Sequence, residues 1–130
     1  MSIETICIID DDPIFVFGTK ILLKNNNFCD TILVSNNGEE GLECLKSFFK
    51  ENNKLPELIF LDLNMPVLDG WGFLGAFKES FKEVNTKIYI LSSSIDSRDI
   101  ERAKEYFLVK DFIAKPLTDS IITDLKNNFQ

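Results

Sequence analysis

Hydrophobic residues along this chain alternate between short continuous runs and longer stretches in which they recur every three or four positions. Short uninterrupted runs are typical of β-strands that are buried on both faces. The runs predict five strands, at residues 3–9, 31–35, 58–61, 87–91 and 112–114. The periodic stretches between them predict five helices, at residues 13–24, 38–50, 72–84, 98–107 and 117–129.

The first predicted helix has clear start signals. Asp12 is a good N-cap residue, and Pro13 suits the first helical position because its missing N–H would have no partner there. Ile14, Phe17 and Ile21 share one face of this helix, at helical spacing.

Strands that alternate with helices predict an α/β fold: a parallel sheet with helices on both faces and right-handed crossovers. The length of 130 residues suits one domain, and no repeat or linker interrupts it, so we expect a single domain over residues 1–130. Doubly wound sheets bind ligands at the carboxyl ends of their strands, where the winding reverses. The candidate functional residues are therefore those at the carboxyl ends of the predicted strands.

Composition narrows the possible functions. Twenty-one acidic against fourteen basic side chains give a net charge of −7, which argues against binding to nucleic acid phosphates. The N-terminal apolar run is too short for a signal peptide or a membrane span, so we expect a cytoplasmic protein without membrane association. Cys7, Cys29 and Cys44 form no CxxC pair and leave an odd thiol, and Cys7 and Cys44 lie in apolar contexts, which favours buried, reduced thiols. Histidine is absent, so chemistry must rest on carboxylates, hydroxyls and lysine.

Acidic residues follow two of the predicted strands. Asp10, Asp11 and Asp12 follow the first, and Asp62 ends the apolar run of the third. Two carboxylates about 4 Å apart repel by roughly 4 kcal/mol at an effective dielectric constant near 20. Mg²⁺ relieves such repulsion, so the cluster predicts a magnesium site. Alternatively, Asp12 caps a helix and its neighbours are solvated turn residues, but the buried position of Asp62 favours the site.

Two further strand ends carry groups suited to phosphate. Ser92 follows the fourth strand with a hydroxyl, and Lys115 follows the fifth with a cation. A carboxylate acts as a nucleophile on phosphorus when a metal and a lysine neutralise the crowded oxygens, which makes Asp62 the candidate nucleophile. Taken singly, a serine such as Ser92 is more often a turn residue, and a Lys-Pro pair such as Lys115–Pro116 more often belongs to an ordinary loop. Only the full set of residues, in this order at the strand ends, is specific for a phosphoryl-transfer site.

Four segments together closely resemble the receiver domain of two-component response regulators: IIDDDP (8–13), LDLNMPVLDGW (61–71), ILSSS (90–94) and IAKPL (113–117). The resemblance covers nearly the whole chain. It implies a flavodoxin-like (βα)5 fold with strand order 2-1-3-4-5. It also implies a phosphorelay function, in which a histidine kinase or a histidine phosphotransfer protein donates a phosphoryl group and a conformational switch signals to a protein target.

The resemblance assigns roles to the acidic cluster. Asp62 corresponds to the phosphoacceptor, and Asp11 to a direct Mg²⁺ ligand. Asp10 corresponds to a ligand that acts through water, and Asn64 to one that binds through its backbone carbonyl. Mg²⁺ is the implied cofactor.

The same resemblance assigns the switch. Ser92 corresponds to the hydroxyl that turns toward the phosphoryl group, and Lys115 to the lysine that pairs with a phosphoryl oxygen, with a cis bond to Pro116. Phe112 stands where many members carry an aromatic with a hydroxyl. A switch that depends on that hydroxyl is excluded here, and an apolar rotamer change remains available.

Three functional readings differ in what they require. The first is a stand-alone receiver whose only chemistry is its own phosphorylation and dephosphorylation. The second is a Mg²⁺-dependent phosphatase of the haloacid-dehalogenase type, which needs a second aspartate where this chain has Asn64. The third is an interaction module that works without phosphorylation, which would be expected to lack part of the acidic set or the lysine. The complete set favours the first.

Overall fold

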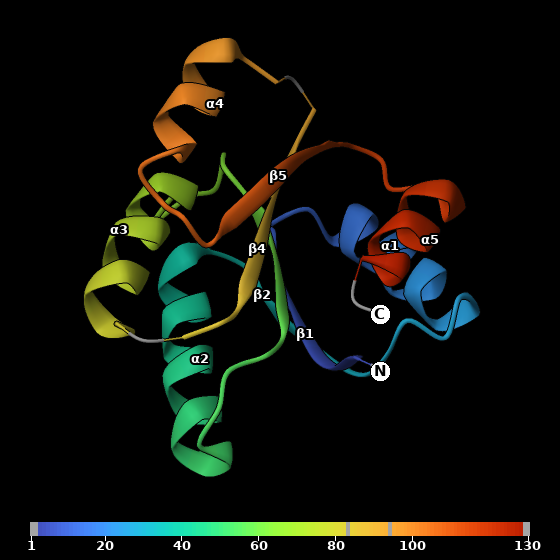
Figure 1. The fold of residues 1–130 in the computed structure, drawn as a ribbon, viewed down its shortest axis with the longest axis horizontal. Coiled ribbons are helices and arrows are strands. Elements are labelled where there is room, and N and C mark those ends of the chain that lie inside the picture. Colours follow the sequence, from blue (N-terminus) through green and yellow to red (C-terminus); the bar gives the residue numbers. More distant parts are fainter. Residues whose placement is uncertain (1–2, 83, 94, 129–130) are drawn as a thin grey trace.

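A computed structural model describes residues 3–82, 84–93 and 95–128. Within these residues one parallel sheet has the strand order β2-β1-β3-β4-β5. The strands are β1 (Ile3–Ile9), β2 (Cys29–Ser35), β3 (Leu58–Asp62), β4 (Lys87–Ser92) and β5 (Val109–Ala114), and the helices are α1 (Pro13–Asn25), α2 (Gly38–Asn52), α3 (Gly70–Ser80), α4 (Ser97–Ala103) and α5 (Asp119–Asn127). Figure 1 shows α1 and α5 on one side of the sheet and α2 and α3 on the other. The predicted fold class and strand order are confirmed.

Capping side chains set helix boundaries that periodicity alone misplaced. The helix predicted at residues 72–84 begins at Gly70, because the Asp69 side chain accepts a hydrogen bond from the Gly72 N–H at 2.8 Å. It ends at Ser80. The last helix begins at Asp119 because Thr118 caps it, and residue 129 of its predicted range lies outside the described residues. The predicted helix 98–107 spans only Ser97–Ala103.

The apolar stripe predicted on α1 faces outward. Ile14, Phe17 and Ile21 are 83%, 67% and 45% exposed. The residues that α1 buries are Val16, Thr19 and Leu23. Apolar side chains occur at 14–17 and again at 21–23, so they lie on most sides of this helix and their spacing does not identify the inner face.

Two hydrophobic clusters cover the two faces of the sheet, and β3 contributes to both. Ile59 and Leu61 point toward α2 and α3, while Leu58 and Phe60 point toward α1 and α5. Burying each such side chain stabilises the fold by roughly 1.5–3 kcal/mol. All five residues of β3 are buried, so Asp62 is held at the end of the most protected strand.

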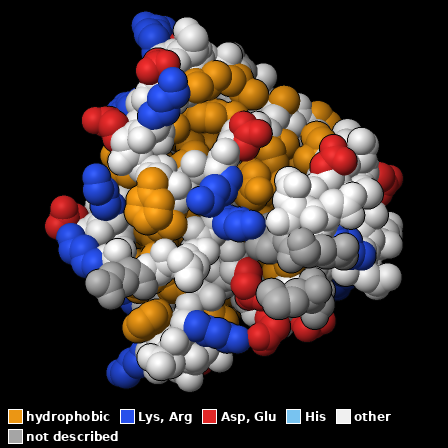
Figure 2. Space-filling model, in the orientation of Figure 1, with side chains coloured by type: hydrophobic (Ala, Val, Ile, Leu, Met, Phe, Trp, Pro, Cys, Tyr) orange, Lys and Arg blue, Asp and Glu red, His pale blue; other side chains and the backbone are white. Residues whose placement is uncertain are grey.

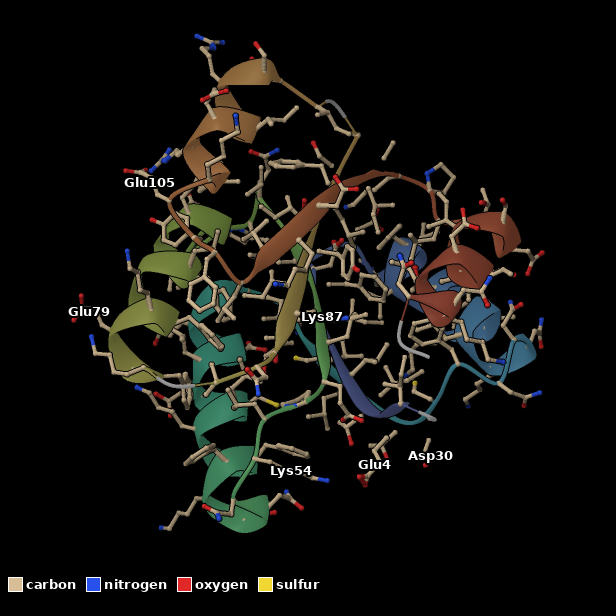
Figure 3. All side chains as sticks on the ribbon, viewed as in Figure 1. Glu4, Asp30, Lys54, Glu79, Lys87 and Glu105 are labelled. Carbon is tan, nitrogen blue, oxygen red and sulfur yellow. The ribbon has the colours of Figure 1, made fainter. Side chains whose placement is uncertain are left out.

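The opposite, amino-terminal end of the sheet carries polar contacts at or near its surface. Glu57 accepts hydrogen bonds from the N–H groups of Glu4 and Thr5 at 2.6 and 3.2 Å. Lys54 pairs with Glu4 at 2.7 Å, and Figure 3 shows both side chains at this end, near Asp30. An exposed ion pair of this kind contributes little to stability.

Gly70 allows α3 to start directly against the end of β3. A Cβ atom at this position would lie 2.8 Å from the Asp62 carbonyl oxygen and 2.8 Å from Leu63 Cα. The Gly70 N–H also donates to the Leu63 carbonyl at 3.0 Å. These neighbours are backbone atoms, so they cannot rotate away from an added methyl group.

We expect Gly70→Ala to destabilise the fold by about 1–3 kcal/mol, because the methyl group forces the backbone beside Asp62 to shift. Gly75→Ala is the matched control in the same helix, since nothing lies within 4 Å of its added Cβ. It should stabilise the fold by about 0.5–1 kcal/mol, because alanine is the better helix former. Urea denaturation of both variants measures the difference, and equal effects at the two positions would contradict the steric argument.

Candidate functional site

The carboxyl ends of β1 and β3 bring three aspartates together. The two strands are neighbours, with Ile9 in register with Leu61, so Asp10 follows β1 beside Asp62 at the end of β3. Carboxylate oxygens of Asp10, Asp11 and Asp62 lie within 4.8 Å of one another. Asp11 is exposed, whereas the other two are buried. The structure therefore places the predicted acidic cluster at one edge of the sheet.

Lys115 supplies the positive charge of the cluster. Its Nζ lies 2.8 Å from Asp10 Oδ2 and 3.6 Å from Asp62 Oδ1. Asp10 is fully buried, and its Oδ1 accepts a hydrogen bond from the Asp12 N–H at 2.9 Å. A buried carboxylate needs such partners, since desolvation of an isolated one is very costly.

Asp62 is less well compensated than Asp10. Burial raises the pKa of Asp62, and the negative charges of Asp10 and Asp11 raise it further. Lys115 and the Asn64 N–H, 3.5 Å from Oδ1, lower the pKa of Asp62 without cancelling the rise. The ionised form of this carboxylate is therefore disfavoured until another cation joins the cluster.

Asp12 and Asn64 occupy the margins of the cluster. Asp12 Oδ1 accepts hydrogen bonds from the N–H groups of Ile14 and Phe15 at 3.0 and 3.3 Å, which confirms it as the N-cap of α1. Asn64 is exposed in the loop that follows β3, and its N–H points to Asp62 Oδ1 at 3.5 Å. The Asp-Asp-Asp triplet thus divides into two cluster acids and one capping acid.

Ser92 and Phe112 lie on the neighbouring strands. Ser92 is buried at the end of β4, and its carbonyl accepts the Lys115 N–H at 2.9 Å, which aligns the base of the lysine with the site. Phe112 of β5 is in register with Ile90 and packs, half-buried, against the cluster on the α2 and α3 side. The peptide bond between Lys115 and Pro116 is cis.

Phe15 is a contact that sequence reasoning missed. The Lys115 Nζ lies 4.5 Å from the centroid of its ring, within the range of a cation–π interaction. Phe15 belongs to the first turn of α1, directly after the acids. No spacing or motif in the sequence connects residue 15 with residue 115, so only the folded chain reveals the pair.

The oxygen atoms of the cluster fit a hard divalent cation. Mg²⁺ binds oxygen ligands at about 2.0–2.1 Å in octahedral geometry, which places neighbouring ligand atoms about 3 Å apart and opposite ones about 4 Å apart. Carboxylate oxygens within 4.8 Å of one another need only small side-chain adjustments to reach these separations. The negative charge left over by Lys115 favours the same ion.

Comparison with known families identifies the class of domain. Residues 6–126 match the response regulator receiver domain, and the chain belongs to this family. The nitrate/nitrite response regulator protein NarL of Escherichia coli K12 is 31% identical over 121 residues, which cover 90% of this chain and 52% of that protein. The chain thus spans about half the length of this curated relative.

Solved structures of receiver domains superpose closely on this fold. A two-component response regulator from Cytophaga hutchinsonii has a TM-score of 0.89 at 28% identity, covering 98% of this chain and 97% of that chain. A CheY-like receiver domain protein from Methanospirillum hungatei has a TM-score of 0.74 at 25% identity, covering 97% and 93%. Among the described residues, no helix is both long and apolar enough to cross a membrane.

We expect Asp62→Asn to raise the melting temperature by a few degrees at pH 7 in the presence of a chelator. The pKa of Asp62 is raised in the fold, so its charged form costs stability at high pH, and this cost disappears as pH falls below the unfolded value of about 3.9. The advantage of the variant should therefore shrink toward zero as the pH falls to about 4 or below.

Asp30→Asn provides the control for this melting series. It removes the same charge from an exposed residue at the opposite end of the sheet, seen in Figure 3. We expect no change in melting temperature from it at any pH. An equal gain from both variants would assign the effect to net charge and not to the cluster.

Proposed function

We propose that residues 1–130 act as a single cytoplasmic receiver domain that accepts a phosphoryl group on Asp62. The observation that carries this proposal is the position of Asp62, buried at the end of β3, 3.6 Å from Lys115 Nζ and next to two further carboxylates. These 130 residues contain no histidine, so the phosphohistidine donor lies outside them, on a histidine kinase or a histidine phosphotransfer protein.

The transfer uses groups of this chain in defined roles. An Asp62 carboxylate oxygen attacks phosphorus, the new O–P bond forms as the P–N bond of the donor breaks, and the imidazole leaves with a proton from solvent. Lys115 stays beside the phosphoryl oxygens and offsets their charge. Asp11, Asp62 and the Asn64 carbonyl would hold Mg²⁺, with Asp10 acting through water, and the ion when bound neutralises charge on the transferred group.

Ser92 and Phe112 form the proposed switch. A hydroxyl that hydrogen-bonds an ionised phosphoryl oxygen contributes about 1.5–3 kcal/mol, which is enough to draw the loop after Ser92 inward. Phe112 is half-buried on the adjacent strand, so part of its ring surface is still available to be buried. The loop and the ring would then change together as one two-state element.

Two exposed apolar areas suit protein partners. The stripe of Ile14, Phe17 and Ile21 on α1 starts two residues after Asp12, so it borders the acidic cluster and suits the phosphodonor protein. Figure 2 shows hydrophobic side chains gathered around α4 and β5, where Ile95 and Ile100 are exposed. This second area adjoins the loop after Ser92 and suits the target that reads the switch.

Phosphorylation tests the proposal directly. With Mg²⁺ and a small acyl-phosphate donor, we expect the intact mass to increase by one phosphoryl group, and Asp62→Asn to abolish the increase. Asp12→Ala should still be labelled, although it loses about 1 kcal/mol of stability with its helix cap. Labelling of Asp62→Asn at the wild-type level would reject Asp62 as the acceptor, and sustained turnover of a phosphate ester would favour a phosphatase.

The switch is separable from the chemistry. We expect Ser92→Ala to be phosphorylated on Asp62, because the acids and Lys115 are intact, but to shift much less toward the active conformation. Amide chemical shifts of residues 95–112, with and without the phosphoryl mimic beryllofluoride, measure this shift. Ser93→Ala is the control, since that side chain is exposed. Identical shift changes in wild type and Ser92→Ala would remove Ser92 from the switch.

A further inference from the structure

Two of the three cysteines face each other between β1 and α2, away from the acidic cluster. Cys7 lies on β1 and is fully buried, whereas Cys44 lies on α2 and is partly exposed. The Cys44 side chain borders a surface hollow whose rim includes Val67 of the loop before α3. Small reagents in solvent therefore have access to one sulfur of the pair and not to the other.

The packing of α2 on β1 brings the two thiols together. A Cβ at Gly41 would lie 2.7 Å from Ile9 Cδ1, so the glycine lets the helix backbone approach the strand closely. Cys7 precedes Ile9 by two residues on the same strand face, and Cys44 follows Gly41 by three on the same helix face. Figure 1 shows α2 running antiparallel to β1. The step from Ile9 back to Cys7 and the step from Gly41 on to Cys44 therefore point in the same direction, which brings the two cysteines together.

The two thiols have opposite chemical character. The Cys7 thiol acts as a hydrogen-bond donor to the Cys44 sulfur, which lowers the pKa of Cys44 to about 6 and raises that of Cys7. The buried Ser35 side chain also lowers the pKa of Cys44 by hydrogen bonding. Burial instead raises the pKa of Cys29 to about 11. Cys44 is therefore the nucleophilic thiolate of the chain, because thiolates react and thiols do not.

We propose that Cys7 and Cys44 form a peroxide-responsive pair, in which Cys44 is oxidised first and Cys7 then closes a reversible disulfide between β1 and α2. The Cys44 thiolate attacks a peroxide oxygen, the O–O bond breaks, and the leaving hydroxide becomes water while Cys44 becomes a sulfenic acid. Cys7 then loses its proton, its thiolate attacks the Cys44 sulfur to form the S–S bond, and the displaced hydroxide takes up that proton and leaves as a second water. Two thiols are oxidised by two electrons, and one hydrogen peroxide is reduced to two waters.

The charge around Cys44 selects the oxidant. Glu39, Glu40 and Glu43 line the same hollow, so an anionic reagent such as oxidised glutathione is repelled there. Hydrogen peroxide is small and neutral and is not repelled. A reducing cytoplasm keeps the pair as thiols between oxidising episodes.

The test treats the full chain with hydrogen peroxide at low protein concentration, then alkylates the remaining thiols in denaturant and maps them by mass spectrometry. We expect wild type to lose two of its three alkylatable thiols, to keep Cys29, and to regain both after reduction. The disulfide should also raise the melting temperature, because it constrains the unfolded chain. Cys29→Ser, which removes only the control thiol, should lose two thiols in the same way.

Two variants separate the roles of the pair. Cys44→Ser changes a partly exposed side chain and should abolish the disulfide. Cys7→Ala should be oxidised more slowly, because it loses the hydrogen bond that lowers the pKa of Cys44, but the sulfenic acid that forms at Cys44 has no partner thiol and should persist for dimedone to trap. In the untreated Cys7→Ala and wild-type proteins, matched circular dichroism spectra confirm folding. Three intact thiols in folded wild type, under peroxide that oxidises free cysteine, would overturn the proposal, as would a disulfide that includes Cys29.

Discussion

The ion pair between Lys115 and two buried carboxylates is the interaction on which the rest of the site depends. Asp10 is fully buried, which is tolerable because Lys115 Nζ lies 2.8 Å from one of its oxygens and the Asp12 N–H donates to the other. The same ammonium group is 3.6 Å from Asp62 and compensates it incompletely, so the pKa of Asp62 stays raised. One lysine among three acids leaves an excess of negative charge, and this imbalance suits the site to a divalent cation.

The sheet order supplies the geometry of this ion pair. The position of β1 beside the central strand β3 places Asp10 next to Asp62, and β4 and β5 bring Ser92 and Lys115 to the same edge. The Ser92 carbonyl holds the Lys115 backbone, so the proposed switch strand and the charge partner share a hydrogen bond. A change at β4 would therefore reach the lysine through the backbone and not only through solvent.

Much of the fold could be predicted because buried parallel strands read as continuous hydrophobic runs and because Asp12 and Pro13 mark a helix start locally. The starts of α3 and α5 differ from the predicted residues 72 and 117, because apolar periodicity locates a helix only approximately. The first residue of each helix is set instead by its N-cap, Asp69 for α3 and Thr118 for α5. The predicted acids do lie together at the sheet edge. Their proposed roles in metal binding and phosphotransfer come from the family resemblance and from the chemistry of the cluster.

By itself the sequence determined the number and type of the secondary-structure elements, the sheet order through its family resemblance, and the candidate acids and lysine at the strand ends. Only the tertiary structure decided that Ile14 and Phe17 face solvent, that Phe15 contacts Lys115, and that Cys7 meets Cys44. The physical reason is the distance along the sequence over which each signal acts. Periodicity and capping report interactions between residues a few positions apart, whereas these three outcomes depend on how α1 and α2 rotate and approach as they pack on the sheet.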